Sequence, residues 1–400
     1  MKFCFVSEVF PYRKDGKLII PGGGEAHAFF LSRELVKRGH EVKMITGRWK
    51  GTPKREIIDG IEFMRYGSYS PWFKDSLVVS FKNMAVNTIS CFRTLDEAIR
   101  TDRPDFIIAP VSFALPRAFL LAKAYKIPLI AEVHDVYKIP LYLKHYGKDY
   151  GLLIYPGLLY IWLYNNLPKY ADLVETASTQ HVGDLLAKEF RVPREKICVT
   201  GNGLEIEKYR YSADKQQLIV VLGRLVSYKR VDKAIEIFKQ VRERIPNAKL
   251  AIIGDGPDRE RLMQLAEGEK IEFMGFIPEE KKLMMLQRAK ILLTCSEFEG
   301  FGIVPIEAFA CGGFPIVSDI PTHREVVGKH GFVFRSTSEA VQRILDLLSD
   351  EKTREKLARE GRKFVEVTYT WQKVCDRFIQ MIDGFHGRIS HQRHKTQKRT

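Results

Sequence analysis

The sequence predicts an α/β protein with two doubly wound parallel sheets, one in each half of the chain. A chain of 400 residues is long enough for two domains, and 45% hydrophobic content is enough to bury two cores. Short apolar runs alternate with amphipathic helical stretches, which is typical of parallel sheets covered by helices on both faces. The expected strands are residues 3–6, 41–45, 106–109, 129–132 and 173–175, then 218–222, 249–253, 271–274, 291–294 and 314–317.

A mixed polar segment at about residues 192–213 separates the two halves. It contains Thr200-Gly201-Asn202-Gly203 and has no sustained periodicity, so we expect a domain boundary there. Ligands of open parallel sheets bind beyond the carboxyl ends of the strands. Two Rossmann-like domains joined by a hinge would therefore hold a ligand in the cleft between them.

The composition limits the partners and the compartment. The net charge of +15 favours nucleotide phosphates, nucleic acid or an acidic membrane surface, and charge alone does not choose among them. Part of this charge lies in residues 387–400, which have basic but no acidic side chains, and we expect residues 389–400 to form a basic disordered tail. The six cysteines include no Cys-x-x-Cys pair, which argues against a zinc site or a disulfide framework and fits a reducing, cytoplasmic setting.

Neither a signal peptide nor a membrane-spanning helix is expected. The apolar run of residues 1–6 is too short for a signal peptide, and it is typical of a first strand. The longest uncharged stretch, residues 150–168, is interrupted by Pro156, Gly157 and the Asn165-Asn166 pair, so it does not supply the roughly 20 apolar residues that a span requires.

A glycine cluster follows the first strand and precedes a helix. Gly23 and Gly24 allow backbone amides to approach an anion at the positive end of that helix. A plain turn explains the cluster equally well. Its spacing differs from the Gly-x-Gly-x-x-Gly pattern of nicotinamide and flavin dinucleotide sites.

A basic turn follows the first strand of the second half. Arg224 can form paired hydrogen bonds with phosphate oxygens, and Lys229 supplies a second positive charge near the start of the next helix. Together they could neutralise a pyrophosphate. The alternative is a solvated basic turn.

The most informative segment is residues 297–307, after the strand at 291–294. Pro305 fits the first turn of a helix, so Glu307 lies near the helix start and Glu299 lies in the glycine loop before it. Two carboxylates and the loop amides of residues 300–302 thus meet at one strand end, which suits the vicinal hydroxyl groups of a sugar nucleotide more than a metal ion. The alternative makes Glu299 a loop charge and Glu307 a partner of the helix dipole.

Glu299 and Glu307 in Glu-Gly-Phe-Gly-Ile-Val-Pro-Ile-Glu resemble the paired-glutamate signature of glycosyltransferase family 4, whose members have the GT-B fold. Further segments agree in order with that family over residues 1 to about 385. They are the glycine loop at 22–24, the diphosphate clamp at 223–225 with Lys229, the base-binding turn at 273–276, and the segment 369–374, where the last helix crosses back to the first domain.

The resemblance implies a domain assignment. Residues 1–195 plus 371–388 would form the N-terminal, acceptor-side domain, and residues 196–370 would form the C-terminal domain that binds the nucleotide sugar.

The resemblance also implies roles for single residues. Arg224 and Lys229 would stabilise the diphosphate leaving group. Glu307 would bind the ribose. The other implied contacts to the donor are Gly23 and Gly24 in the N-terminal loop, Gly275 and Phe276 at the base, Glu299 with the loop residues Gly300, Phe301 and Gly302 at the donor sugar, and His134, after the strand at 129–132, beside that sugar.

The family retains anomeric configuration, and we find no convincing nucleophile on the opposite face, so a front-side displacement is the preferred hypothesis. The sequence has no Asp-x-Asp pair of the type that metal-dependent glycosyltransferases use, so we expect no metal and no other cofactor. The donor is expected to be a UDP or GDP sugar carrying a hexose or N-acetylhexosamine. UDP is preferred on family frequency only.

The acceptor is not identified by the sequence. Aromatic and basic residues at 137–164 and 73–92 suit an anionic membrane interface, which makes peripheral association with the cytoplasmic face and a lipid-linked acceptor a hypothesis. A buried helix pair with a few surface lysines explains the first of these segments equally well.

Two further classes of function are weighed. A GT-B-fold sugar-nucleotide epimerase, or an enzyme like glycogen phosphorylase, would share the two-domain fold. The paired glutamates argue against the former, and the chain is short for the latter. A basic nucleic-acid-binding protein is the non-enzyme alternative, but no recognition motif is present and the basic residues are spread over both halves, so no nucleic acid is expected.

Overall fold

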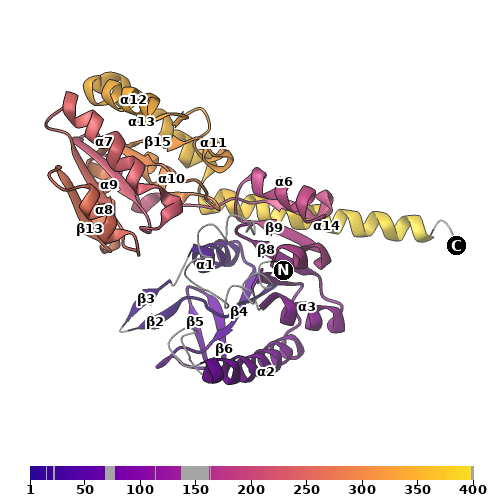
Figure 1. The fold of residues 1–400 in the computed structure, drawn as a ribbon. Helices are drawn as coiled ribbons and strands as arrows, with labels where there is room; N and C mark the ends of the chain where they lie inside the picture. The colour runs from indigo at the N-terminus through magenta and orange to yellow at the C-terminus, as the bar shows by residue number, and fades with distance from the viewer. Residues whose placement is uncertain are drawn as a thin grey trace.

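The computed structural model describes residues 1–14, 16–20, 23–67, 77–112, 114–136, 162 and 164–397, without the side chains of residues 14, 77–85 and 389–397. Two α/β domains follow one another along the chain, and the last helix runs from the second domain back along the first (Figure 1). The expected fold class is confirmed.

The first domain is built on an eight-stranded sheet in the order β10-β9-β8-β7-β1-β4-β6-β5. All neighbouring strands in it are parallel except β5, which pairs antiparallel with β6. Its strands are β1 (Lys2–Val6), β4 (Glu41–Gly47), β5 (Arg55–Ile58), β6 (Ile61–Tyr66), β7 (Phe106–Pro110), β8 (Leu129–Val133), β9 (Leu173–Thr176) and β10 (Ile197–Val199). A separate antiparallel hairpin consists of β2 (Tyr12–Lys14) and β3 (Lys17–Ile19).

Helices cover both faces of this sheet. They are α1 (Gly23–Lys37), α2 (Leu77–Thr101), α3 (Ala114–Tyr125), α6 (Gln180–Glu189) and α14 (Trp371–Gln397), with short 3₁₀ turns η2 (Leu167–Tyr170) and η3 (Arg194–Lys196). A further 3₁₀ turn, η4 (Ile206–Lys208), packs against the second domain.

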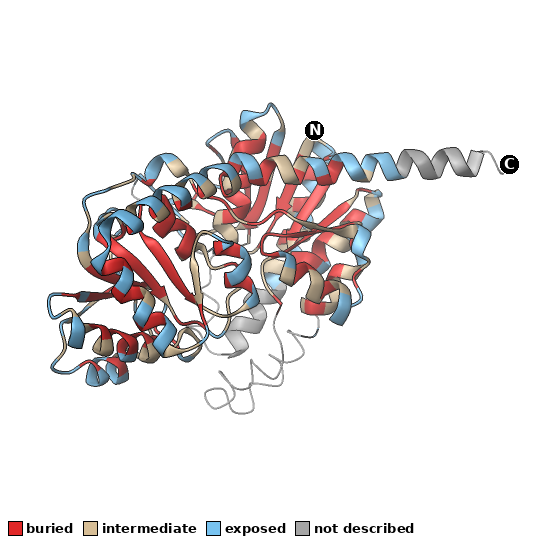
Figure 2. Ribbon diagram, turned by 90° about the horizontal axis from the view of Figure 1, so that it is seen from above, coloured by how far each residue is buried: buried red, intermediate tan, exposed pale blue. Residues whose placement is uncertain are grey.

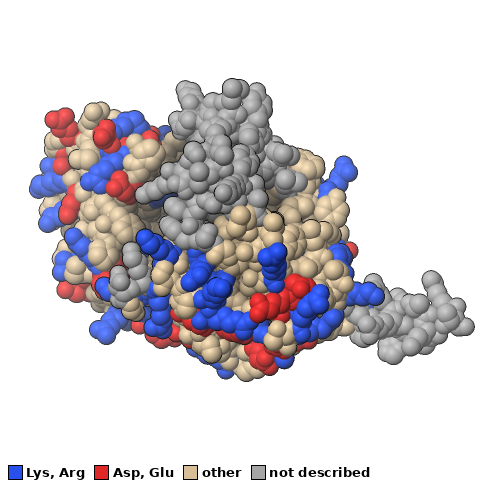
Figure 3. Space-filling model, turned by 90° about the horizontal axis from the view of Figure 1, so that it is seen from below, with Lys and Arg blue, Asp and Glu red and all other residues tan. Residues whose placement is uncertain are grey.

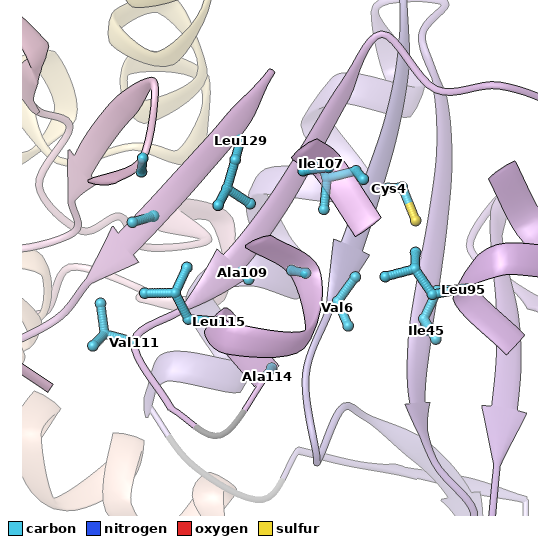
Figure 4. Close-up of a cluster of buried hydrophobic side chains, with 14 of the residues drawn as sticks. Cys4, Val6, Ile45, Leu95, Ile107, Ala109, Val111, Ala114, Leu115 and Leu129 are labelled. Carbon is cyan, nitrogen blue, oxygen red and sulfur yellow. The ribbon is translucent and has the colours of Figure 1, made fainter. Parts of the chain in front are cut away.

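The alternation of side chains along β1 shows how the two faces form. Cys4 and Val6 pack with α2, α3 and α6 on one face (Figure 4). Phe3 and Phe5 pack with α1 and α14 on the other face. Because successive side chains of a strand point to opposite faces, one apolar run supplies both cores.

The second domain has a six-stranded, wholly parallel sheet in the order β13-β12-β11-β14-β15-β16. Its strands are β11 (Gln216–Leu222), β12 (Lys249–Ile253), β13 (Ile271–Gly275), β14 (Ala289–Thr294), β15 (Phe314–Ser318) and β16 (Phe332–Phe334). Its helices are η5 (Ser227–Lys229), α7 (Val231–Arg244), α8 (Arg259–Leu265), α9 (Glu279–Arg288), α10 (Ile303–Ala310), α11 (Pro321–Val327), α12 (Thr337–Ser349) and α13 (Glu351–Thr368).

The second sheet is also covered on both faces. Side chains of α7, α8 and α12 pack on one face, and side chains of α9, α10, α11 and α13 pack on the other. The central strands of both sheets are buried, whereas the outer sides of the helices are exposed (Figure 2).

All ten expected strands are present within one or two residues of their predicted bounds. The domain boundary needs a correction. The sequence predicts an end of the first domain at residue 195, but β10 pairs in parallel with β9, so this domain extends to Val199. A strand of three half-buried residues has too little apolar periodicity to be recognised in the sequence.

The end of the chain differs from the prediction as well. Residues 389–397, which the sequence analysis assigns to a disordered tail, continue α14 as helix to Gln397. Arginine, lysine and glutamine are good helix formers, and basic side chains near a helix C-terminus interact favourably with its dipole. The crossing of α14 to the first domain is as predicted, because Val374 and Phe378 are fully buried in the core that contains Phe3.

Candidate active site

The loops at the carboxyl ends of β8 and β14 bring the two domains into contact. His134 follows β8, and Gly300 lies in the loop between β14 and α10. A methyl group on Gly300 would lie 3.1 Å from the carbonyl oxygen of His134, so a larger residue would push the two loops apart slightly. The Ser178 hydroxyl, after β9, also donates a hydrogen bond to the carbonyl oxygen of Gly300.

Glu299 is held in a fixed position in this loop. Lys229 Nζ donates to its two carboxylate oxygens at 2.6 and 2.8 Å, and the Ser296 hydroxyl donates to Oε1 at 2.7 Å. The Thr322 hydroxyl donates to the backbone oxygen of Glu299 at 3.0 Å. The Lys229 and Glu299 side chains are only 19% and 13% exposed, so their ion pair is partly shielded from water.

Arg224 lies on the same turn as Lys229, directly after β11. Its side chain is exposed, and the hydrogen bonds and ion pairs of the described residues give it no partner. An unpaired guanidinium beside a lysine that is already near a carboxylate is suited to an anionic ligand.

Glycines allow the loops around this turn to pack closely. Gly223 and Gly254 have φ angles of 151° and 134°, and a methyl group on Gly254 would lie 1.9 Å from the Gly223 oxygen. The Gly254 amide donates to the carbonyl oxygen of Gly275 at 2.9 Å. Next to Gly275, the Phe276 side chain is 91% exposed, which leaves its ring available for stacking.

Glu307 is buried, with 6% of its side chain exposed. The Tyr209 hydroxyl and Lys282 Nζ both donate to its Oε1 at 2.8 Å. Burial alone would lower the pKa of Lys282, but the carboxylates of Glu307 and Glu279 raise it overall, so Lys282 remains charged. In the described part of the chain, no hydrogen bond uses the second oxygen of Glu307.

His134 lies in a cluster of buried ionisable side chains. Its Nε2 is 2.9 Å from Oε1 of Glu132, which is 1% exposed. Burial alone would lower the pKa of His134, but Glu132 more than offsets this and raises it. The ring also contacts His27 edge to face at 5.7 Å, and His27 Nε2 is 3.1 Å from the buried Glu175.

The glycine loop before α1 reaches this histidine. Gly24 lies in the first turn of α1, and a methyl group on it would be 2.9 Å from Nε2 of His134. Gly23 has no atom within 4 Å of such a methyl group. Gly22 lies outside the described residues.

Asp135 lies beside the same loop of the second domain. Burial raises its pKa to about 7, and the nearby Glu299 carboxylate adds to this. Its Oδ1 accepts a hydrogen bond from the Val136 amide at 2.7 Å. A carboxyl that titrates near neutral pH therefore faces the Glu299 loop.

The structure brings most of the predicted site residues into one continuous series. Gly275 contacts Gly254, which contacts Gly223 beside Lys229, and Lys229 pairs with Glu299. From Glu299 the series continues through Gly300 to His134 and Gly24. Phe301 and Gly302 have environments that differ from those of the other predicted site residues. Phe301 is largely buried against Tyr369, and Gly302 is the left-handed residue before α10.

Several residues of the site were missed in the sequence analysis. Tyr209, Lys282 and Ser296 hold the two glutamates, and Glu132 holds His134. The Gly254-Asp255-Gly256-Pro257 turn after β12 was the one clear signal overlooked, because glycines at a strand end mark a close backbone approach. The others carry no local pattern.

The membrane hypothesis falls mainly outside the described residues, because residues 68–76, 137–161 and 163 are not described. Among the described helices, none combines the length and apolar composition that crossing a bilayer requires.

Two family descriptions match this chain. "Glycosyl transferases group 1" matches residues 205–364, which include Lys229 and both glutamates. "Glycosyltransferase Family 4" matches residues 21–208, which include Gly24 and His134.

Individual proteins agree. The chain is 24% identical to an uncharacterised glycosyltransferase of Methanocaldococcus jannaschii, over 95% of this chain and 97% of that one. It is 26% identical to a sulfoquinovosyl transferase of Arabidopsis thaliana, over 65% of this chain and about half (52%) of that one.

Solved structures have the same fold. Sucrose-phosphate synthase from Thermosynechococcus elongatus superposes with a TM-score of 0.73 at 16% identity, covering 96% of this chain and 99% of that one. HepE of Anabaena, in complex with UDP-glucose, has a TM-score of 0.69 at 16% identity, with the same coverage. This chain therefore belongs to the family 4, group 1 glycosyltransferases, nucleotide-sugar-dependent enzymes with the GT-B fold.

Proposed function

We propose that this enzyme is a retaining, metal-independent glycosyltransferase that moves a hexose or N-acetylhexosamine from a nucleotide diphosphate sugar to an acceptor hydroxyl. The observation that carries the proposal is the continuous series of groups from Phe276 to His134. It runs along the facing strand ends of two domains, which is where open α/β sheets bind ligands.

The donor fits this series from one end to the other. The base would stack at Phe276 and bond to backbone atoms near Gly275. The ribose hydroxyls would bind the second oxygen of Glu307, whose first oxygen is fixed by Tyr209 and Lys282. A carboxylate that is already held by two donors needs little reordering to accept a diol.

The diphosphate would lie at Arg224 and Lys229. The bond from the anomeric carbon to the phosphate oxygen breaks, the bond to the acceptor oxygen forms on the same face, and the acceptor proton passes to the leaving phosphate. Charge grows on that phosphate in the transition state, and the two cations would stabilise it in place of a metal ion. The Glu299 loop and His134 would hold the donor sugar.

We prefer UDP over GDP as the donor nucleotide. HepE, which shares the fold, is described in complex with UDP-glucose. We also propose that the enzyme is cytoplasmic, associates with the membrane surface and uses a lipid-linked acceptor. The aromatic and basic composition of the first domain is the only support for this.

A thermal-shift screen of UDP, GDP and ADP sugars tests the donor. The preferred donor raises the melting temperature, because a ligand that binds only the folded state stabilises it by mass action. The screen is repeated with Glu307→Ala, which should weaken donor binding. Steady-state kinetics are then measured for Glu307→Ala and Arg224→Ala. Arg224→Ala should lower turnover by about 100-fold if the guanidinium acts on the leaving group. No shift with any sugar nucleotide, or unchanged donor kinetics in both variants, contradicts the proposal.

A further inference from the structure

A pocket of about 500 Å³ lies in the first domain, and none of the residues that line it belongs to the candidate active site. Basic side chains dominate its polar lining: Arg48, Lys54, Arg55 and Arg65, with Glu97 as the acidic residue. Figure 3 shows basic side chains, with acidic ones among them, on the side of the molecule that contains α2. The pocket itself is defined between α2 and the ends of β4, β5 and β6.

The pocket lies at the same edge of the sheet as His134. Arg48 directly follows β4, Arg65 lies at the end of β6, and Lys54 precedes β5, which runs in the opposite direction. In the sheet order, β7 and β1 separate β8 from β4. Three to five strand spacings of about 4.8 Å put the pocket roughly 14 to 24 Å along the edge from His134.

Two of the four cations in the pocket have carboxylate partners. Arg55 pairs with Glu97, and Arg65 pairs with Glu56, each at 2.5 Å. Arg48 Nε donates to the Thr52 carbonyl oxygen at 3.1 Å. Within the described residues, neither Arg48 nor Lys54 has an ion pair with a carboxylate, so the pocket keeps an excess of positive charge.

Arg65 is the buried member of these four basic residues. Its side chain is 0% exposed, its guanidinium lies 5.2 Å from the ring of Phe63, and its Nε has no hydrogen-bond partner among the described residues. Burial lowers the pKa of Arg65 despite the nearby Glu56. A buried arginine with an unused N–H group costs stability, and it places a positive charge in the protein beside the pocket.

We propose that this pocket binds a phosphate group of the acceptor. This inference rests on the proposed function, which requires an acceptor. It identifies a phosphate group as the feature by which that acceptor is recognised. Phosphate oxygens match the planar, multiply donating guanidinium of arginine, and Lys54 adds a point charge at the exposed rim. An acceptor that reaches from this pocket to His134 is longer than a single sugar ring. The phosphate belongs either to a soluble phosphorylated glycan or to the headgroup of a lipid.

The test measures anion binding by the full chain with UDP at saturation, so that the donor site is filled. Inorganic pyrophosphate is titrated calorimetrically into the wild type, into the double variant Arg48→Gln/Lys54→Gln, and into Lys249→Gln. Lys249 is an exposed lysine at the start of β12 in the other domain and controls for the loss of charge. The double variant should bind pyrophosphate at least about tenfold more weakly than the wild type, whereas the control should bind like the wild type.

A flotation assay distinguishes the two sources of phosphate. Vesicles of phosphatidylcholine with phosphatidylglycerol are compared with vesicles of phosphatidylcholine alone. Flotation with the anionic vesicles that is lost in the double variant assigns the pocket to a lipid headgroup. Variant-sensitive pyrophosphate binding without flotation assigns it to a soluble phosphorylated acceptor.

Equal pyrophosphate affinity and equal flotation in wild type and double variant overturn the inference, and circular dichroism checks that the variant is folded. UDP binding to the wild type tests the proposed function separately. If a nucleotide diphosphate binds but neither pyrophosphate nor anionic vesicles do, only the pocket assignment fails. If none of UDP, GDP and ADP binds, the proposed function fails whatever the pocket does.

Discussion

Gly24 illustrates how tightly single residues are constrained around His134. A methyl group at position 24 would lie 2.9 Å from the imidazole, whereas a methyl group at position 23 would meet no atom within 4 Å. Both residues are in the first turn of α1. The two positions therefore separate an effect on the site from an effect on the helix.

We expect Gly24→Ala to displace the His134 ring and to lower kcat about tenfold or more, since small misplacements of catalytic groups are costly. Gly23→Ala should lower kcat much less than Gly24→Ala and raise stability by up to about 1 kcal/mol, because alanine favours helix over glycine. Steady-state kinetics and thermal unfolding of both variants measure this. Equal kcat in the two variants would show that the contact with His134 does not matter.

Asp135 gives a pH-dependent prediction. The folded chain holds its proton up to a pKa of about 7, whereas the unfolded chain loses it at about pH 4. Between these values the folded state binds more protons than the unfolded state, so this carboxyl lowers the free energy of unfolding as the pH rises, and the loss is complete above about pH 7.

Asp135→Asn removes this charge and keeps an oxygen that can accept from the Val136 amide. Its stability relative to the wild type should rise between pH 5 and pH 8, by about 2 to 4 kcal/mol in all. Urea unfolding at both pH values measures the difference. Asp214→Asn, at an exposed carboxyl, is the matched control. A constant difference between Asp135→Asn and the wild type would show that Asp135 is ionised throughout.

The sequence predicted the residues of the site that lie in local patterns, and it could not predict those that support them. The sequence predicts the positions of Glu299, Glu307 and Lys229, because they follow strands and lie near glycines or a helix start. Tyr209 is 98 positions away from the glutamate that it contacts. Such partners come together because α9 and α10 pack on β11 in one hydrophobic cluster. No periodicity in the sequence predicts that contact.

At the scale of elements, continuous apolar runs decided which strands were predictable. Nine of the ten predicted strands lie in the interiors of the two sheets, and β13 lies at an edge. A continuous apolar run is what a buried parallel strand requires. Among the missed strands, β6 is buried inside the first sheet, but Glu62 and Arg65 interrupt its apolar run. The hairpin strands β2 and β3 and the three-residue edge strand β16 are stabilised by pairing more than by burial, and their sequences resemble loops.

Helix α14 carries a prediction about packing across the sequence. Phe378 is fully buried and contacts Phe3 edge to face at 5.9 Å. Phe378→Ala should lower the free energy of unfolding of the first domain by about 3 to 5 kcal/mol, because a cavity remains where the ring was. Lys373→Ala, on the exposed side of the same helix, should change it by less than about 0.5 kcal/mol. Urea unfolding followed by circular dichroism compares the two, and similar midpoints would show that α14 is not part of this core.

At the scale of the whole molecule, the second domain caps a helix of the first. Glu325 of α11 accepts hydrogen bonds from the Gln180 and His181 amides at 2.7 and 2.8 Å. These amides begin α6, where the Thr179 side chain provides no cap. A carboxylate at a helix N-terminus contributes about 1 kcal/mol, which here stabilises the contact between the domains.

Glu325→Ala should therefore shift the molecule towards more open arrangements, by roughly fivefold in the ratio of closed to open forms. Small-angle scattering should show a larger radius of gyration than in the wild type. Glu360→Ala, which removes an exposed carboxylate from α13, is the control. Equal scattering from both variants would mean that this cap does not hold the domains together.

The position of α14 has a consequence for how the protein is made. One face of the first sheet is covered by α1 together with residues 371–382, which follow the second domain in the chain. While the ribosome is still translating the second domain, the aromatic side chains of β1 and β7 on that face lack part of their covering. The N-terminal domain therefore cannot complete its core until residues that follow the C-terminal domain in the chain have been synthesised, although N-terminal domains usually fold first.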